Sequence, residues 1–178
     1  MRNGSQSSDH RDTLTTPPPL GLKSYTFHNN FFFFSVFLGL DGPFGGNQTS
    51  WSDINHSLDF GSINKVQIRS GAAIDAIRVQ YGSVWAPWHG GNGGNLNSPI
   101  ELNGERIIKI QGKTSSYNNK LAIVQIEFHT NQGRKFGPYG IGNSNETPWG
   151  IEREQCALTW IAGDSDKIVR SLSFNFQC

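Results

Sequence analysis

Charged residues and long apolar runs are both scarce in this chain. Only 16% of its 178 residues are charged, and the formal net charge is +1. A protein that holds nucleic acid or an anionic membrane by electrostatic attraction needs a strongly basic face, which this composition does not supply. The sequence contains no run of 18 apolar residues, so we expect no transmembrane helix. We therefore expect no nucleic-acid partner and no membrane insertion.

Cysteines and metal-ligand patterns are equally sparse. The two cysteines, Cys156 and Cys178, are compatible with one disulfide or with two free thiols, because sequence alone cannot place their Cα atoms. The five histidines show no ligand spacing with one another or with the cysteines, so we expect no metal site. No segment resembles a nucleophile elbow or a phosphate-binding Gly loop that opens a helix. We expect no catalytic residues, no enzymatic activity and no cofactor.

Glycine is abundant, with 21 residues, and with the many Asn and Ser residues it favours turns and short strands. Three stretches, 71–81, 118–128 and 166–176, align without a gap at offsets of 47 and 48 residues. Apolar and polar residues alternate in each, which is typical of half-buried β-strands. The alternating apolar residues are Ile77, Val79, Tyr81, Val124, Ile126, Phe128, Leu172, Phe174 and Phe176. A repeat of this length predicts an all-β fold of three similar units around a pseudo-threefold axis, with these residues in one shared core.

The chain divides near residue 40 into an N-terminal extension, 1–40, and a globular domain, 41–178. Residues 1–26 are polar and include three consecutive prolines, which is typical of disorder. The apolar stretch 31–38 leaves three alternatives open: an imperfect secretion signal or mis-assigned start, a strand packed on the domain, or an exposed segment.

Several motifs in the domain resemble the jacalin-related lectins. They are the segment 42–51, which begins Gly-Pro-Phe-Gly-Gly-Asn, the Ser-Gly-Ala-Ala-Ile-Asp segment 70–75, the Gly-rich loop 89–94, and the Lys-Phe-Gly-Pro-Tyr-Gly segment 135–140 with Thr147 and Pro148 after it. The resemblance implies a β-prism, in which three four-stranded Greek-key sheets form the faces. It also implies sugar binding without enzymatic activity.

Sugar sites in this family pair a G-x-x-x-D loop with a facing Gly-rich loop. The resemblance therefore implies a carbohydrate site formed by Gly71, Ala72, Ala73, Ile74, Asp75, Gly90, Gly91 and Asn92. The Asp75 carboxylate would accept charge-assisted hydrogen bonds from sugar hydroxyls. The amides of Ala73 and Ile74 would donate, with one more from Gly91 or Asn92. Two tryptophans, Trp85 and Trp88, flank the loop, and we expect core positions for them rather than a stacked sugar.

The third repeat departs from the family pattern. Its loop implies a second, degenerate site formed by Gly45, Gly46, Asp166, Lys167, Ile168 and Arg170. Arg170 stands where the first repeat has Asp75, and an arginine cannot accept a hydrogen bond. It could instead meet the sulfate or carboxylate of an acidic glycan. In the second repeat the gapless alignment places Asn118 and Ala122 at these positions, which leaves no anchor.

We therefore expect a lectin for mannose/glucose-type glycans, because residues precede Gly42 whereas galactose-type members need a free glycine N-terminus. The alternatives are a β-prism interaction module that has lost sugar binding and a binder of acidic or sulfated glycans through Arg170. The expected partners are glycans or glycoproteins. We also expect the chain to form a homodimer, which would present several sugar sites together. We expect the protein to be secreted. A cytoplasmic location remains the alternative, because the glycosylation sequons at Asn47, Asn55 and Asn145 do not distinguish the two.

Overall fold

The computed structural model describes residues 39–142 and 145–178. The N-terminal stretches 1–26 and 31–38, with the three alternatives for the latter, lie outside the described residues. Over the described ranges, no helix combines the length and apolar character needed to cross a membrane.

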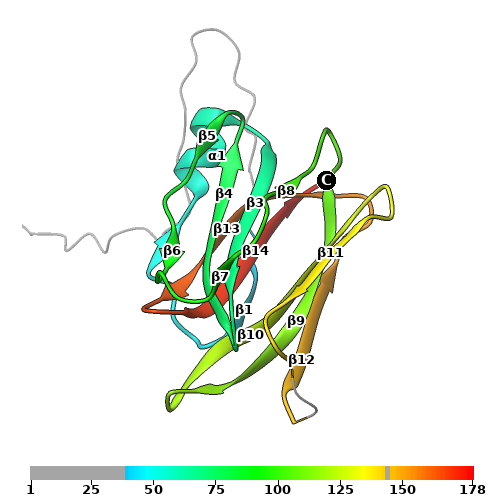
Figure 1. The fold of residues 1–178 in the computed structure, drawn as a ribbon. Helices are drawn as coiled ribbons and strands as arrows, with labels where there is room; N and C mark the ends of the chain where they lie inside the picture. The colour runs from blue at the N-terminus through cyan, green and yellow to red at the C-terminus, as the bar shows by residue number, and fades with distance from the viewer. Residues whose placement is uncertain (1–38, 143–144) are drawn as a thin grey trace, which may run out of the picture. The chain divides into compact units, whose positions relative to one another are not determined.

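The described chain forms three antiparallel sheets and one short helix, α1 (Ile54–Phe60), as Figure 1 shows. The first sheet has in its centre β3 (Ile63–Ser70) and β4 (Ile74–Tyr81); β4 is flanked by β5 (Val84–Trp85) and β6 (His89–Gly90), and β3 by β7 (Asn95–Leu96) and β8 (Ile100–Glu101). The second sheet has the order β11 (Lys135–Tyr139), β10 (Lys120–Thr130), β9 (Ile107–Tyr117), β12 (Thr147–Glu152). The third has the order β1 (Asp41–Gly45), β14 (Val169–Gln177), β13 (Ala157–Ser165), β2 (Trp51–Ser52).

Each of the three aligned stretches supplies an inner strand of its own sheet: β4, β10 and β14. In the first sheet the two short strands beside β4 share one edge, and those beside β3 share the other. The sheet is therefore four strands wide, like the other two. This arrangement confirms the prediction of an all-β prism with three equivalent faces.

Eight of the nine predicted core residues contact one hydrophobic core shared by the three sheets. Seven are buried, and the eighth, Phe176, is half-buried and packs against them. The prediction was wrong for Val124, which belongs to a second, smaller cluster with Ala73, Ala122 and Ile168. The β9–β10 pairing shifts its register between Ile123 and Gln125, and such a bulge places one extra residue in the strand. Ile123 occupies the main core instead.

The structure of the β9–β10 hairpin also changes how the second repeat aligns with the other two. The β9–β10 hairpin closes through Asn118 and Asn119, both with positive φ, and pairs Tyr117 with Lys120. The equivalent connections of the other repeats, 71–73 and 166–168, are three residues long. When the strands are matched by their core residues Ile77, Ile126 and Leu172 instead, the core residues Ile74, Ile123 and Val169 become equivalent, with spacings of 49 and 46 residues. Val124, rather than Ala122, then corresponds to Asp75, and the second repeat still offers no carboxylate.

A disulfide joins Cys156 to Cys178, which decides between the two alternatives for the cysteines. It connects the residue before β13 with the end of the chain after β14, and these two strands pair along most of their length. Closing a loop of this length stabilises a protein by about 3 kcal/mol in the chain-entropy estimate.

Candidate functional site

The connecting loops of all three repeats meet at one end of the sheets. Ala73 from the first loop and Ile168 from the third pack in the second cluster with residues of β10 and with Tyr117. Gly91 joins this contact, since a Cβ on it would lie 2.5 Å from the main-chain oxygen of Lys167. The structure therefore brings the predicted site residues of the first and third repeats to the same end of the molecule.

The first-repeat loop holds Asp75 in a frame of glycines. A Cβ on Gly93 or on Gly94 would lie 2.3 Å from one of the Asp75 carboxylate oxygens. Side chains at these two positions would therefore displace the carboxylate. The Gly91 N–H donates to the main-chain oxygen of Asp75, 2.9 Å away, so it is engaged within the protein. Of the two loop residues predicted to donate to a sugar, Asn92 is the exposed one.

The surroundings of Asp75 raise its pKa above the ordinary value. Burial has the largest effect and raises the pKa, while the amide of Gly71 and the charge of Arg69 lower it by less. Arg69 also ties the Gly-rich loop to β3, because its Nη1 donates to the main-chain oxygens of Asn92 (3.1 Å) and Gly93 (3.3 Å).

The start of the Gly-rich loop is fixed by an interaction that the sequence did not reveal. The imidazole of His89 stacks on Trp51, with ring centroids 3.7 Å apart, and its Nε2 lies 2.8 Å from Oδ1 of Asp53. Asp53 is only 1% exposed and also accepts from the Tyr81 hydroxyl at 3.3 Å. His89 and Tyr81 lie 36 and 28 residues from Asp53 in the sequence, so no local motif could have indicated these contacts.

The third-repeat loop borders a surface depression of about 680 Å³. The lining residues are Gly45, Gly46, Asn47, Gln48, Lys120, Leu121, Asp164, Ser165, Asp166 and Arg170. Four residues of the predicted degenerate site are thus brought together here. Of the other two, Lys167 contacts Gly91 through its main chain, and Ile168 packs in the second cluster.

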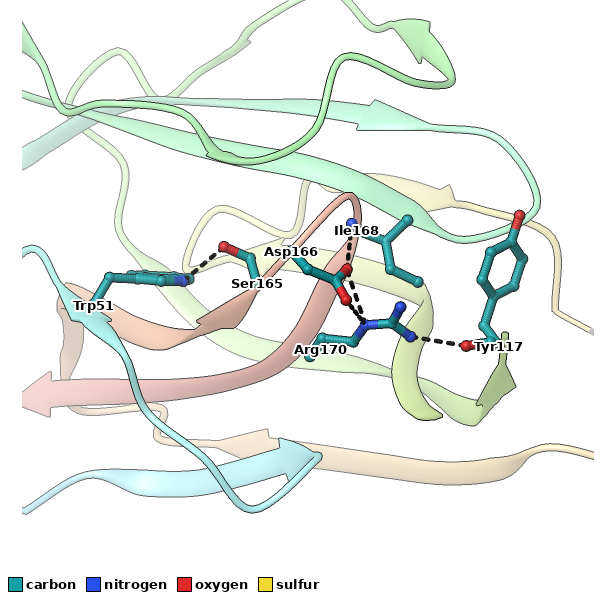
Figure 2. Close-up of polar contacts among 6 residues, drawn as sticks. All are labelled: Trp51, Tyr117, Ser165, Asp166, Ile168 and Arg170. Carbon is teal, nitrogen blue, oxygen red and sulfur yellow. Dashed lines mark hydrogen bonds and ion pairs between the residues drawn. The ribbon is translucent and has the colours of Figure 1, made fainter. Parts of the chain in front are cut away.

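Arg170 is directed into the protein rather than toward an external anion. The residue is buried, and its side chain is only 10% exposed. Nε donates to both carboxylate oxygens of Asp166 at 3.0 Å, and Nη1 donates to the main-chain oxygen of Tyr117 at 2.8 Å (Figure 2). The guanidinium therefore serves as an internal counter-ion and as a bridge to the end of β9.

Asp166 is the exposed member of this pair. Its side chain is 42% exposed, and Oδ1 also accepts from the Ile168 N–H at 3.1 Å (Figure 2). Burial raises the pKa of Asp166, but the hydrogen bonds from Arg170 and from the Ile168 amide outweigh it, so the pKa lies below its usual value. The loop thus presents a carboxylate from its first position instead of its fifth.

The expectation that Trp85 and Trp88 would be core residues was wrong. Both are half-buried, and neither belongs to a core cluster. The guanidinium carbon of Arg78 lies 4.2 Å from the ring centroid of Trp85 and 4.5 Å from that of Trp88. Arg78 alternates with the core residues Ile77 and Val79 along β4, so it and the indoles lie on the outer face of the first sheet.

Among residues 39–142 and 145–178, no group of three or more His, Cys, Asp or Glu side chains could hold a metal ion. The hydrogen-bonding groups at the loop end are instead carboxylates, main-chain amides and short polar side chains. Such groups recognise hydroxyl-rich ligands through directional hydrogen bonds.

Comparison with known proteins decides the family. The family profile described as jacalin-like lectin domain matches residues 41–175. This chain belongs to the jacalin-like lectin family. The family is one of lectins, in agreement with the expectation that the chain has no enzymatic activity.

Relatives and solved structures agree with this assignment. Zymogen granule membrane protein 16 of Rattus norvegicus is 30% identical over 143 residues, which are 80% of each chain. The solved structure of AcmJRL, described as a mannose-binding jacalin-related lectin from Ananas comosus, is 27% identical, with a TM-score of 0.68 over 79% of this chain and 97% of that one. The artocarpin–mannotriose complex matches in fold, with a TM-score of 0.68, 22% identity and coverage of 79% and 98%.

Proposed function

We propose that this protein is a lectin that binds mannose/glucose-type glycans at the Asp75 loop. The observation that carries the proposal is the glycine frame around this carboxylate, formed by Gly71, Gly93 and Gly94. Glycines leave the approach to the carboxylate free of side chains, so a pyranose ring can come close to the main chain. The likeness to the Ananas comosus lectin, described as mannose-binding, supports the sugar class.

The chemistry at Asp75 follows from its charge. An ionised carboxylate accepts two hydrogen bonds from neighbouring sugar hydroxyls, and each is stronger than a bond between neutral groups. We assign further donors to the amides of Ala73 and Ile74 and to the exposed Asn92. The Gly91 amide is not among them, because it bonds to Asp75 itself.

The depression at the third repeat is a second candidate sugar site, with Asp166 as its anchor. The exposure of this carboxylate favours the assignment, since its side chain is 42% exposed and an ionised carboxylate has acceptor sites beyond the hydrogen bonds from Arg170 and the Ile168 amide. The same geometry makes an acidic glycan a poor ligand here. The guanidinium is already paired, and a bound anion would lie beside Asp164 and Asp166, two carboxylates that line the depression.

A glycan array and a site-resolved NMR titration distinguish between the two candidate sites. The variants are Asp75→Asn and Asp166→Asn, with Asp59→Asn on the exposed end of α1 as a matched control. We expect Asp75→Asn to weaken neutral-glycan binding by about 10- to 150-fold, the equivalent of about 1.5–3 kcal/mol for a hydrogen bond to a charged group. Asp59→Asn should bind like the wild type.

Two results would contradict the Asp75 assignment. If Asp166→Asn alone abolishes binding, the third-repeat depression is the sugar site. If the wild type binds no glycan on the array, the chain is a β-prism interaction module that has lost sugar binding.

We also propose that the protein is secreted. The Cys156–Cys178 disulfide supports this location, because structural disulfides persist mainly in oxidising compartments. Intact mass and N-terminal sequencing of the natural protein test the proposal and also define its N-terminus.

A further inference from the structure

Arg78 is a half-buried cation without a carboxylate partner among residues 39–142 and 145–178. Six basic side chains of the described chain have such a partner at 2.7–3.3 Å, in the pairs Lys65–Glu101, Lys109–Glu152, Arg134–Glu105, Lys135–Glu127, Arg153–Asp41 and Arg170–Asp166. Burial lowers the pKa of Arg78, and no neighbouring carboxylate offsets that effect. The outer face of the first sheet therefore contains an uncompensated positive charge.

The guanidinium of Arg78 is held in a fixed position. Arg78 lies opposite Gln67 in the β3–β4 pairing, and its Nε and Nη2 donate to Oε1 of Gln67 at 3.1 and 2.7 Å. Gln67 is only 6% exposed, and its own Nε2 donates to the main-chain oxygen of Asn97 at 3.1 Å. A buried amide that is itself anchored thus fixes the direction of the arginine.

Two indole rings and one unused nitrogen complete the arrangement. The rings of Trp85 and Trp88 lie against the guanidinium and displace water from it. Nη1 has no hydrogen-bond partner within the part of the chain that the structure describes. A rigid, partly desolvated guanidinium with a free N–H edge is well suited to bind a carboxylate or a sulfate through two parallel hydrogen bonds.

We propose that Gln67, Arg78, Trp85 and Trp88 form a subsite for an anionic group, a carboxylate or a sulfate, on a glycan held at the Asp75 loop. The location on β4 supports a glycan as the carrier. Arg78 follows Asp75 by three residues on the same strand, a distance of about 10 Å, which is within the span of a short oligosaccharide. The β3–β4 register shifts between Ile74 and Ala76, and this bulge interrupts the alternation that would otherwise place Asp75 and Arg78 on opposite faces. The indole rings add apolar surface for a sugar ring beside the anionic group. This inference rests on the proposed lectin function.

The test measures binding of the full-length protein to three oligosaccharides of the same backbone: a neutral one, one with a uronic-acid carboxylate and one with a sulfate. The wild type should bind one of the acidic forms on the order of 10-fold more tightly than the neutral form. Arg78→Gln should remove this preference and leave neutral binding unchanged, which also shows that the variant folds. Arg78→Lys should lose most of the preference for the acidic form, because an ammonium group lacks the planar pair of N–H donors that a guanidinium offers.

Lys65→Gln is the matched control. It removes one positive charge from the same face, where Lys65 is paired with Glu101, and the preference should survive. Equal losses in Lys65→Gln and Arg78→Gln would overturn the proposal, because the preference would then reflect general surface charge. Equal wild-type binding of neutral and acidic forms would overturn it while leaving the lectin function intact. Absence of binding to all three would overturn both.

Discussion

Asp75 and Asp166 are carboxylates in equivalent loops of two repeats, and their surroundings move their pKa values in opposite directions. Burial dominates at Asp75 and raises its pKa. At Asp166 burial acts in the same direction, but the N–H donors of Arg170 and Ile168 outweigh it and the pKa falls. Because the two loops are similar and their hydrogen-bond donors differ, the opposite pKa shifts distinguish the effect of burial from the effect of hydrogen bonds to the carboxylate.

We predict that Asp75 becomes protonated at a higher pH than Asp166 as the pH is lowered. The ionised form accepts stronger, charge-assisted hydrogen bonds from sugar hydroxyls than the protonated form does, so binding that depends on Asp75 should weaken first on acidification. The carboxyl ¹³C shifts of both residues, followed by NMR against pH, give the order directly. Asp59 on α1 serves as an exposed reference. A lower titration midpoint for Asp75 than for Asp166 would contradict the assignment of burial as the dominant influence.

At the scale of secondary-structure elements, Arg170 connects the third-repeat loop to the end of β9. Its N–H groups bridge Asp166 and the main-chain oxygen of Tyr117. We expect Arg170→Ala to lower the free energy of unfolding by about 2 kcal/mol, because it leaves the half-buried carbonyl of Tyr117 without its donor and the Asp166 carboxylate without its counter-ion. The control is Arg153→Ala, which breaks an exposed pair with Asp41 and should cost less than about 1 kcal/mol. Urea denaturation of both variants tests this, and similar losses would show that Arg170 is not a structural bridge.

How much the sequence predicts also differs from element to element. Strict alternation identified the inner strands β4, β10 and β14, because side-chain direction depends only on local geometry. The second repeat was misaligned by two residues, because the strands of its hairpin are longer than those of the other two repeats and β10 contains a bulge between Ile123 and Gln125. The Asn118–Asn119 turn marks where the hairpin closes, but it does not give the length of the strands that follow, so turn chemistry alone does not determine this register.

The candidate sites were predictable only in part. The Gly-rich frame of Asp75 follows from a local motif, so the sequence located it. The orientation of Arg170 depends on Tyr117, and the position of Trp85 and Trp88 depends on Arg78 and its contact with Gln67. These contacts join residues from different strands, so only the folded chain determines them.

At the scale of the whole molecule, the location of both candidate sites at one end of the sheets restricts how the protein can cross-link glycans. The Gly-rich loop beside Asp75 touches the third-repeat loop through Gly91 and Lys167, so the two sites open on the same end. A site with about five hydrogen bonds at about 1 kcal/mol each, reduced by ordering costs, binds a monosaccharide near 1 mM. Strong attachment to a surface then needs several chains presented together.

We therefore predict a homodimer with twofold symmetry, the commonest symmetry of soluble oligomers. A twofold axis turns the loop ends of two chains in different directions, and linked sites increase avidity by about 10² to 10⁴. Sedimentation velocity of the purified protein measures its state, and agglutination of glycan-coated beads measures cross-linking. The dimer should agglutinate the beads, and Asp75→Asn should prevent this without changing the sedimentation coefficient. A strict monomer that still agglutinates would refute the prediction, because cross-linking would then have to use both loop sites of one chain. In that case Asp166→Asn should abolish agglutination while monosaccharide binding at Asp75 persists.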